Sequence, residues 1–230
     1  YGAIIRGDSS QKKIALVFTG HEFAEGGQQI EEYLDNANIK ASFFFTGDFY
    51  RNPDFHPIIR KLYKEGHYLG PHSDQHLLYC DWSKRDSLLV TKSQFRFDLA
   101  DNYTAMARLG IDIKKANIFL PPYEWYNDSI ADWSKELQIQ LINYTPGTLS
   151  HADYTLDSDK NYRSSEKILS SILQYEQTRA AGLNGFILLM HVGAGPGRTD
   201  KFYRKLPELV RYLKAKGYQF QRVDNLVETD

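Results

Sequence analysis

Short apolar runs alternate with amphipathic stretches along the whole chain. Seven short runs are largely apolar, at Ile14–Phe18, Ala41–Thr46, Tyr68–Gly70, Ile118–Leu120, Leu141–Tyr144, Phe186–Met190 and Tyr218–Val223. Continuous runs of this kind are typical of strands that are buried on both faces, as in a parallel sheet. The chain therefore predicts seven buried strands.

The segments between these runs carry apolar residues at helical spacing. Helices are predicted over Gln28–Asn38, Pro57–Glu65, Ser83–Leu109, Ser129–Leu137, Ser164–Ala181 and Lys201–Lys216. Regular alternation of strands and helices indicates a parallel sheet covered by helices. We predict one α/β domain over residues 1–230 that forms an irregular (β/α)7-type barrel. An open doubly wound sheet is the alternative that the pattern leaves open.

Composition narrows the classes of partner. Of the 230 residues, 42% are hydrophobic, and 28 basic and 29 acidic residues give a formal net charge of -1. No basic stripe stands out, which argues against nucleic acid as a partner. No apolar run approaches the roughly 20 residues that span a bilayer. Cys80 is the only cysteine, so no disulfide forms within the chain, and nothing indicates the oligomeric state.

The chain starts at Tyr1 rather than at a methionine. A removed signal peptide and a trimmed cytoplasmic chain both explain such a start. Our expectation is an extracytoplasmic protein, whether secreted, periplasmic or attached to the cell surface.

Polar side chains follow the ends of the predicted strands, where α/β barrels carry their chemistry. The first set is the segment 72–76, His-Ser-Asp-Gln-His, which directly follows the third run. Two histidines four residues apart point the same way if the backbone coils through one turn. Two neutral imidazoles can then bind one divalent ion. A surface or helix-capping pair is the alternative, and the position after a buried strand favours the metal.

Two further strand ends offer ionisable side chains. His21 and Glu22 follow the first run, at a place where a third ligand is needed, because catalytic zinc usually takes three protein ligands. His191 ends the sixth run, and its imidazole can donate a proton near neutral pH. The alternatives are polar loop residues at positions 21 and 22 and a structural histidine at position 191.

The segment 119–125, Phe-Leu-Pro-Pro-Tyr-Glu-Trp, ends the fourth run. Its two prolines stiffen the backbone. Tyr123 and Trp125 could line a groove of sugar size, and Glu124 could act as a base or a metal ligand. A rigid loop with aromatic packing explains the segment equally well. The direction of three further candidates is not fixed by the sequence; they are Asp48, His151 and Asp153.

Together these segments resemble the polysaccharide deacetylase family, the NodB-homology domain of carbohydrate esterase family four. Ile14–Phe18 is similar to the strand before the family's Asp-Asp motif, and Ala41–Phe45 is similar to its second strand. The segment 66–76, Gly-His-Tyr-Leu-Gly-Pro-His-Ser-Asp-Gln-His, resembles the family's Gly-His-Glu-Ile-Gly-Asn-His-Thr-x-x-His segment and is the most specific match. Leu188–His191 resembles the terminal Leu-x-His motif. The resemblance runs through nearly the whole chain, from Ile14 to Val223.

Two departures from the family pattern concern the site itself. The family has Phe-Asp-Asp after the first strand, where this chain has Phe18-Thr19-Gly20. The family has Arg-Pro-Pro-Tyr-Gly in the fourth segment, where this chain begins with Leu120 and ends with Glu124. In the family the Arg pairs with the catalytic Asp, so the loss of both avoids an uncompensated buried charge. We therefore predict a rebuilt site rather than a decayed one.

The resemblance implies a metal-dependent hydrolase that removes N- or O-acetyl groups from a polysaccharide or oligosaccharide. One divalent ion, zinc by expectation, would be bound by His72, His76 and Glu22 and would polarise the acetyl carbonyl. His191 would be the general acid, and His21 or Glu124 the base.

The carbohydrate substrate would contact Tyr123 and Trp125. Two other functions stay open, because a fold alone does not select among them. One is a carbohydrate-binding domain that kept the barrel and lost catalysis. The other is a metal hydrolase that acts on a non-acetyl amide or ester.

Overall fold

A parallel sheet forms the centre of the molecule. The computed structural model describes residues 1–227, and its main sheet has the order β3-β2-β1-β6. These strands are β1 (Lys13–Gly20), β2 (Ser42–Phe45), β3 (Tyr68–Pro71) and β6 (Phe186–His191). β7 (Gln219–Gln221) pairs with the start of β1, and β4 (Ile118–Phe119) forms a second parallel pair with β5 (Gln140–Leu141).

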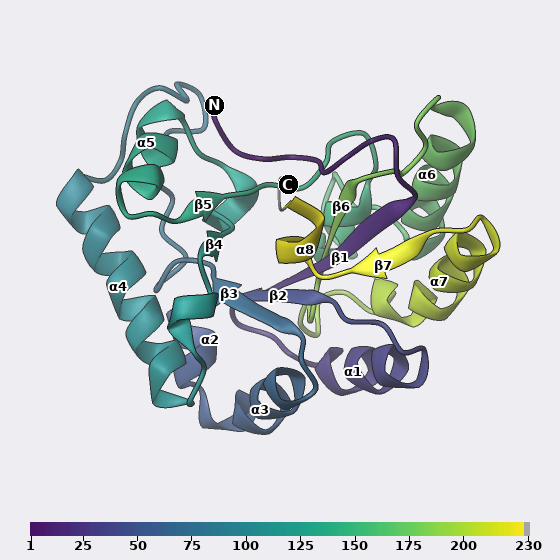
Figure 1. Ribbon diagram of the computed structural model, residues 1–230, viewed down its shortest axis with the longest axis horizontal. Helices are drawn as coiled ribbons and strands as arrows, with labels where there is room; N and C mark the ends of the chain where they lie inside the picture. Colours follow the sequence, from purple (N-terminus) through teal and green to yellow (C-terminus); the bar gives the residue numbers. More distant parts are fainter. Residues whose placement is uncertain (228–230) are drawn as a thin grey trace.

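Backbone hydrogen bonds join the two sheets into a ring. The Leu120 N–H donates to Pro71 O over 3.4 Å at the end of β3, and the Thr145 N–H donates to Ile187 O in β6 over 3.0 Å. The β4–β5 pair thereby bridges the gap between β3 and β6 (Figure 1). The predicted α/β fold with an irregular barrel is confirmed, and each of the seven strands overlaps one of the apolar runs, although β5 shares only Leu141 with its run.

Helices surround this ring of strands in Figure 1. The outer helices are α1 (Gly27–Asn36), α3 (His56–Lys64), α4 (Lys92–Arg108), α5 (Asp128–Glu136), α6 (Ser165–Thr178) and α7 (Leu206–Ala215). Two short helices complete the set, α2 (Gly47–Arg51) after β2 and α8 (Val223–Val227) at the end of the chain. No helix in residues 1–227 is long and apolar enough to cross a membrane.

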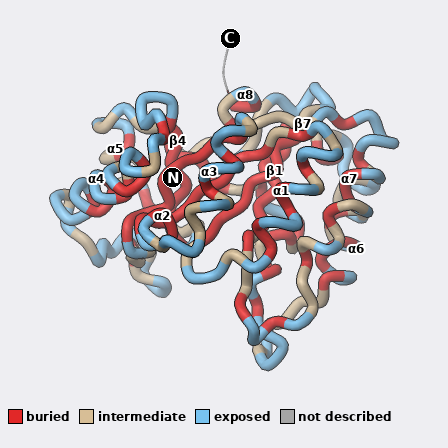
Figure 2. Tube along the Cα trace, turned by 90° about the horizontal axis from the view of Figure 1, so that it is seen from below, coloured by how far each residue is buried: buried red, intermediate tan, exposed pale blue. Residues whose placement is uncertain are grey.

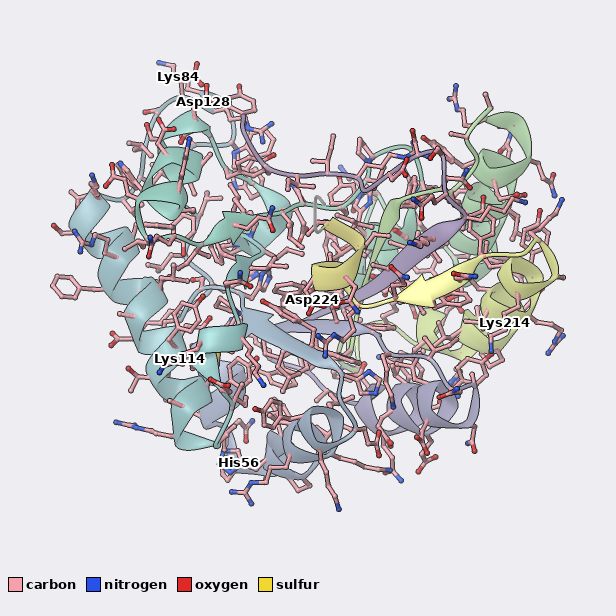
Figure 3. All side chains as sticks on the ribbon, viewed as in Figure 1. His56, Lys84, Lys114, Asp128, Lys214 and Asp224 are labelled. Carbon is pink, nitrogen blue, oxygen red and sulfur yellow. The ribbon has the colours of Figure 1, made fainter. Side chains whose placement is uncertain are left out.

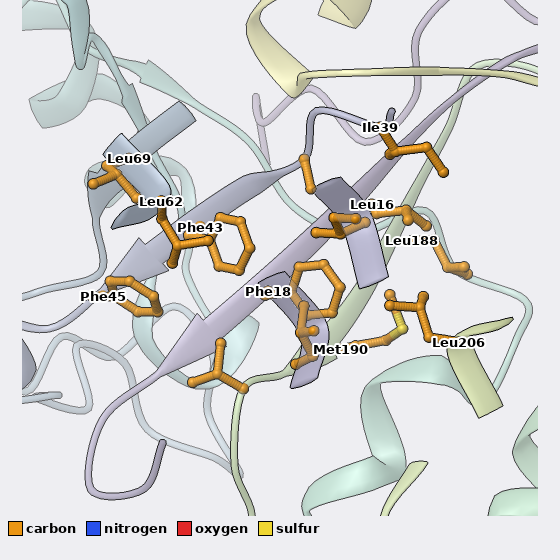
Figure 4. Close-up of a cluster of buried hydrophobic side chains, with 14 of the residues drawn as sticks. Leu16, Phe18, Ile39, Phe43, Phe45, Leu62, Leu69, Leu188, Met190 and Leu206 are labelled. Carbon is orange, nitrogen blue, oxygen red and sulfur yellow. The ribbon is translucent and has the colours of Figure 1, made fainter. Parts of the chain in front are cut away.

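Alternate residues of β1 face two different apolar layers. Leu16 and Phe18 pack with the outer helices, as Figure 4 shows, whereas Ala15 and Val17 point into the ring. Val223 and Leu226 of α8 fill the inner layer from the N-terminal end of the strands. The central strands β1, β2, β3 and β6 are buried almost throughout (Figure 2), and each large apolar side chain so buried contributes about 1.5–3 kcal/mol. The packed centre leaves the C-terminal strand ends as the place for a site.

The helix predicted over Ser83–Leu109 is too long. α4 begins only at Lys92, where Thr91 and Gln94 form a capping box that satisfies the first free backbone N–H groups. The preceding residues form a loop that is closed by a β-bridge between Cys80 and Leu88. This loop carries Trp82 to the mouth of the barrel, which the sequence pattern did not predict.

Candidate active site

A cavity of about 610 Å³ opens at the C-terminal ends of β1, β3 and β6. All the residues predicted for the site line it except Trp125; those lining it are His21, Glu22, His72, His76, Tyr123, Glu124 and His191. These side chains come from segments far apart in the chain. The parallel strands bring them together because their carboxyl ends meet at one end of the barrel.

His72 is held firmly at the end of β3. Its ring Nδ1 lies 2.8 Å from Leu120 O, and its backbone N–H donates to Asn102 Oδ1 over 2.9 Å. A carbonyl oxygen only accepts, so Nδ1 carries the hydrogen and Nε2 keeps the lone pair. Burial lowers the pKa of His72 to about 3, so the ring is neutral at physiological pH. A neutral imidazole oriented through its other nitrogen is the usual state of a metal ligand.

The turn that follows His72 is not the helical turn that the spacing predicted. Ser73 and His76 have φ angles of 74° and 57°, so the backbone passes twice through the left-handed region. The buried Asp98 carboxylate fixes this path by accepting hydrogen bonds from the Asp74 N–H and the Tyr79 hydroxyl. The strained turn still brings the His72 and His76 rings to 5.1 Å between their centres.

His76 lies between two other rings of the site. Its centre is 4.8 Å from that of His21 and 4.3 Å from that of Tyr123. Burial, followed by the neighbouring His72 and His21, lowers the pKa of His76 to about 2. His76 is therefore neutral as well, and its lone pair is available to a cation.

The end of β1 lacks the carboxylates that the family pattern has there. Gly20 replaces a carboxylate of the family pattern, and a Cβ atom there would come within 2.8–2.9 Å of Val192, Phe45 and Phe49. His21 Nδ1 lies 3.1 Å from Thr46 Oγ1, and Glu22 is exposed at the rim. Neighbouring side chains thus occupy the space that a side chain at position 20 would need.

Thr19 stands at the position of the other family carboxylate. Its hydroxyl is buried in the cavity wall and has no hydrogen-bond partner among residues 1–227. An unsatisfied buried hydroxyl costs about 1–3 kcal/mol. A polar ligand in the cavity could therefore form a favourable hydrogen bond with Thr19.

His191 is paired with Asp153, which lies in a 3-10 turn (Ser150–Tyr154). Asp153 Oδ1 is 2.6 Å from His191 Nδ1, and Oδ2 accepts from the His191 N–H over 2.9 Å. Burial lowers the pKa of His191, but the Asp153 carboxylate outweighs it, and the net pKa is raised. The pair holds Nδ1–H toward Asp153 and favours a protonated ring.

Glu124 replaces the glycine of the family pattern in a strained turn. Tyr123 and Glu124 have φ angles of 58° and 53°, which cost on the order of 1–3 kcal/mol each. Burial raises the pKa of Glu124 to about 7, opposed by His191 and assisted by Asp153. A carboxyl group with this pKa can take up or release a proton near neutral pH.

The structure does not place Trp125 on the cavity. Its indole N–H donates to Asp81 O over 3.3 Å, and its ring packs behind Trp82, 5.5 Å away. Trp82 takes the place predicted for Trp125 and lines the cavity. Sequence reasoning missed it because it lies in an irregular loop with no hydrophobic period.

The other candidates lie outside the cavity. Asp48 forms an ion pair with Arg51 over 2.6 Å, and the His151 ring stacks on Tyr144 at 4.6 Å. Asp153 alone of these candidates reaches the site, through His191.

The residues present fit a metal ion only in part. His72 and His76 supply two neutral imidazoles, and the hydrogen bond to Leu120 O leaves Nε2 of His72 free to bind a metal. Within residues 1–227, no group of three or more His, Cys, Asp or Glu side chains is placed to hold a metal ion. A third ligand from the end of β1, Glu22 or His21, stays a prediction.

Comparisons with known proteins address the fold and the family. The family model described as polysaccharide deacetylase matches residues 6–142. The structure is similar to a crystal structure of a peptidoglycan N-acetylglucosamine deacetylase, with a TM-score of 0.78 and 20% identity over 100% of this chain and 94% of that one.

Two other solved structures have the same fold. A CE4 family pseudoenzyme from Bacillus anthracis has a TM-score of 0.74 and 18% identity, over 98% of this chain and 69% of that one. A family 4 acetyl xylan esterase from Clostridium thermocellum, in complex with a cobalt ion, has a TM-score of 0.66 and 22% identity, over 93% of this chain and 89% of that one. At these identities the likenesses show a shared fold. The match of the family model over more than half of the chain shows more: the chain belongs to the polysaccharide deacetylase family.

Proposed function

We infer that this protein is a metal-dependent hydrolase that removes acetyl groups from a polysaccharide. Membership of the family supports the reaction class. The observation that carries the proposal is the His72–His76 pair in the cavity wall, with the His72 Nδ1–H tied to Leu120 O and Nε2 left as a ligand. One structural neighbour is in complex with a cobalt ion, which supports a divalent ion in a protein of this fold.

The metal would be held by His72, His76 and one side chain from the end of β1. A bound divalent ion, zinc by our expectation, polarises a carbonyl oxygen and lowers the pKa of bound water. Glu22 is the first candidate for the third ligand, because its exposed side chain is free to change rotamer. His21 is the second, because its ring already stacks on His76.

Proton transfer would be divided between His191 and Glu124, which both line the cavity. His191, whose pKa the Asp153 carboxylate raises, would donate a proton to the leaving amine or alkoxide. Glu124 would accept a proton from the attacking water, because its pKa of about 7 leaves a large ionised fraction at neutral pH. His21 is the alternative base.

The second candidate function is a carbohydrate-binding domain without turnover. The specific observation in its favour is the packing around Gly20, which closes the place of a family carboxylate. A pseudoenzyme among the structural neighbours shows that this fold occurs without activity. Such a protein would bind a glycan but would release no acetate.

Acetate release decides between the two functions. The purified chain would be incubated with acetylated xylan, chitin oligosaccharides and acetylated peptidoglycan, after chelation and after addition of zinc. Zinc-dependent release that is lost in His72→Ala supports the hydrolase. The matched control is His56→Ala, since His56 lies at the start of α3 on the outer edge of the molecule (Figure 3). Release from none of these substrates, with or without zinc, contradicts the proposal.

A further inference from the structure

We propose that Trp82 is a stacking platform for a sugar unit next to the acetylated one, and that the cavity selects neutral glycans over anionic ones. This inference rests on the proposed function only in taking the ligand to be a glycan. It adds a binding residue and a substrate class to that function.

Exposed apolar side chains gather at this one cavity. Five of them line it: Phe23, Trp82, Tyr123, Tyr154 and Leu156, which are 38–56% exposed. Trp82 is the most exposed of the five, at 56%. Exposed apolar groups that cluster around a hollow mark a binding surface rather than ordinary surface composition. A pyranose ring fits such a surface, because its axial C–H groups form an apolar face while its hydroxyl groups point outward.

The indole of Trp82 packs against two other aromatic rings, tilted against Trp125 and edge-to-face with Tyr123. Its ring centre lies 5.5 Å from Trp125 and 5.5 Å from Tyr123. The Arg85 guanidinium lies 4.1 Å from the Trp125 ring, and its Nε–H donates to Tyr126 O over 2.6 Å. A ring that is positioned before the ligand arrives loses little conformational entropy on binding.

The charges of the cavity wall select against acidic sugars. Of the described residues that line the cavity, none is Lys or Arg, whereas Glu22, Glu124 and Asp159 carry carboxylates. The nearby Arg85 is occupied by the Trp125 ring and by Tyr126 O. A uronic acid carboxylate would therefore meet like charges with no Lys or Arg as a partner, and the His191 ring is already paired with the Asp153 carboxylate. The unpaired Thr19 hydroxyl offers a neutral sugar a hydrogen bond instead.

Calorimetric titration of the whole chain tests both parts of the inference. The neutral probes are chitin oligosaccharides and acetylated xylo-oligosaccharides, and the anionic probe is an oligogalacturonide of similar length. Trp82→Ala should weaken the binding of the neutral probes at least ~10-fold, and Trp82→Phe should keep most of the affinity. The matched control is Phe97→Ala on α4, because Phe97 is 71% exposed but does not line the cavity. The oligogalacturonide should bind at least ~10-fold more weakly than the neutral probes.

Three results would overturn the inference: neutral probes that bind Trp82→Ala as tightly as the wild type, an oligogalacturonide that binds equally well, or no binding of any probe. Calorimetry of the chelated protein measures binding without turnover, so the two proposals fail separately. Trp82-dependent binding without acetate release would defeat the hydrolase and leave the platform standing. Acetate release without any effect of Trp82→Ala on binding would support the hydrolase and contradict the stacking platform.

Discussion

The turn after β3 and the loop after β1 both line the cavity, but the structure holds them in different ways. In the β3 turn, His72 is fixed through Leu120 O and Asn102, and the backbone path is fixed by Asp98. In the β1 loop, His21 has one side-chain hydrogen bond, to Thr46, and Glu22 is exposed.

This difference means that one half of the predicted metal site is preorganised, whereas the other half must form when the ion binds. The β3 turn presents two neutral imidazoles before any ligand arrives, so it can be a preorganised half of a metal site. The β1 loop has lost the carboxylates of the family pattern, and neighbouring side chains have closed the space at Gly20. The activity of this chain therefore depends on whether Glu22 or His21 completes the site.

Substitutions of ligands in the two regions should give the largest effects. His72→Ala should abolish metal binding and reduce acetate release roughly 10³-fold, because an ion contributes several kcal/mol to the transition state. Glu22→Ala should reduce both by a similar factor if Glu22 is the third ligand. Elemental analysis and initial rates measure these effects. Normal metal content in Glu22→Ala, together with its loss in His21→Ala, would assign the third ligand to His21.

The next effect concerns the Asp153–His191 pair at the end of β6. Asp153→Asn should reduce kcat roughly 10- to 100-fold, because the ring loses the partner that sets its tautomer and its charge. It should also move the alkaline limb of the pH profile to lower pH, since the carboxylate is what raises the pKa of His191. An unchanged limb would show that His191 is not the acid.

Glu124 should define the acidic limb of the same profile. In the wild type, kcat/KM should rise as pH increases through about 7, because the base acts in its ionised form. Glu124→Gln should remove this limb along with most of the rate, and metal content should not change. If the limb near pH 7 persists in Glu124→Gln, the base is His21 instead.

The smallest effect is on stability and lies far from the cavity, at the start of β3. Burial is the main cause that lowers the pKa of His67 to about 4, and its Nδ1 accepts from the Ala41 N–H. The unfolded chain takes up a proton below about pH 6.5, which the folded chain resists until about pH 4. The free energy of unfolding should therefore fall by up to about 1.4 kcal/mol for each unit by which the pH decreases between about 6.5 and about 4.

Denaturant titrations of His67→Asn and wild type at each pH test this expectation. Asn can still accept from the Ala41 N–H but does not titrate, so the variant should have the flatter pH dependence. The pKa of the partly exposed Glu65 nearby is raised, so its contribution to the free energy of unfolding changes with pH in the opposite direction, in wild type and variant alike. Equal slopes in the two proteins would contradict the account of His67.

The sequence predicted those features that depend on local pattern. Seven apolar runs became seven strands, and ionisable residues directly after three of them, such as His72 and His191, met at one cavity. Strand ends are easy to predict because a parallel barrel places them all at one face.

The features that were missed depend on contacts between distant segments or on irregular backbone. Asp153 reaches His191 across 38 positions of the chain, and no spacing rule indicates that contact. The left-handed φ angles of Ser73 and His76 replace the predicted helical turn because the buried Asp98 binds the backbone there. Trp82 lies in an irregular loop just before the segment that was predicted as a helix, so no hydrophobic period indicated its exposure.

The metal content of the purified chain tests the central claim most directly. The wild type would be freed of metal, dialysed against a small excess of zinc and analysed beside His72→Ala and the outer control His56→Ala. We expect close to one zinc ion per chain in the wild type and in His56→Ala, and almost none in His72→Ala. A folded wild-type chain that retains no zinc above the level of His72→Ala would contradict the account, and the carbohydrate-binding alternative would then be favoured.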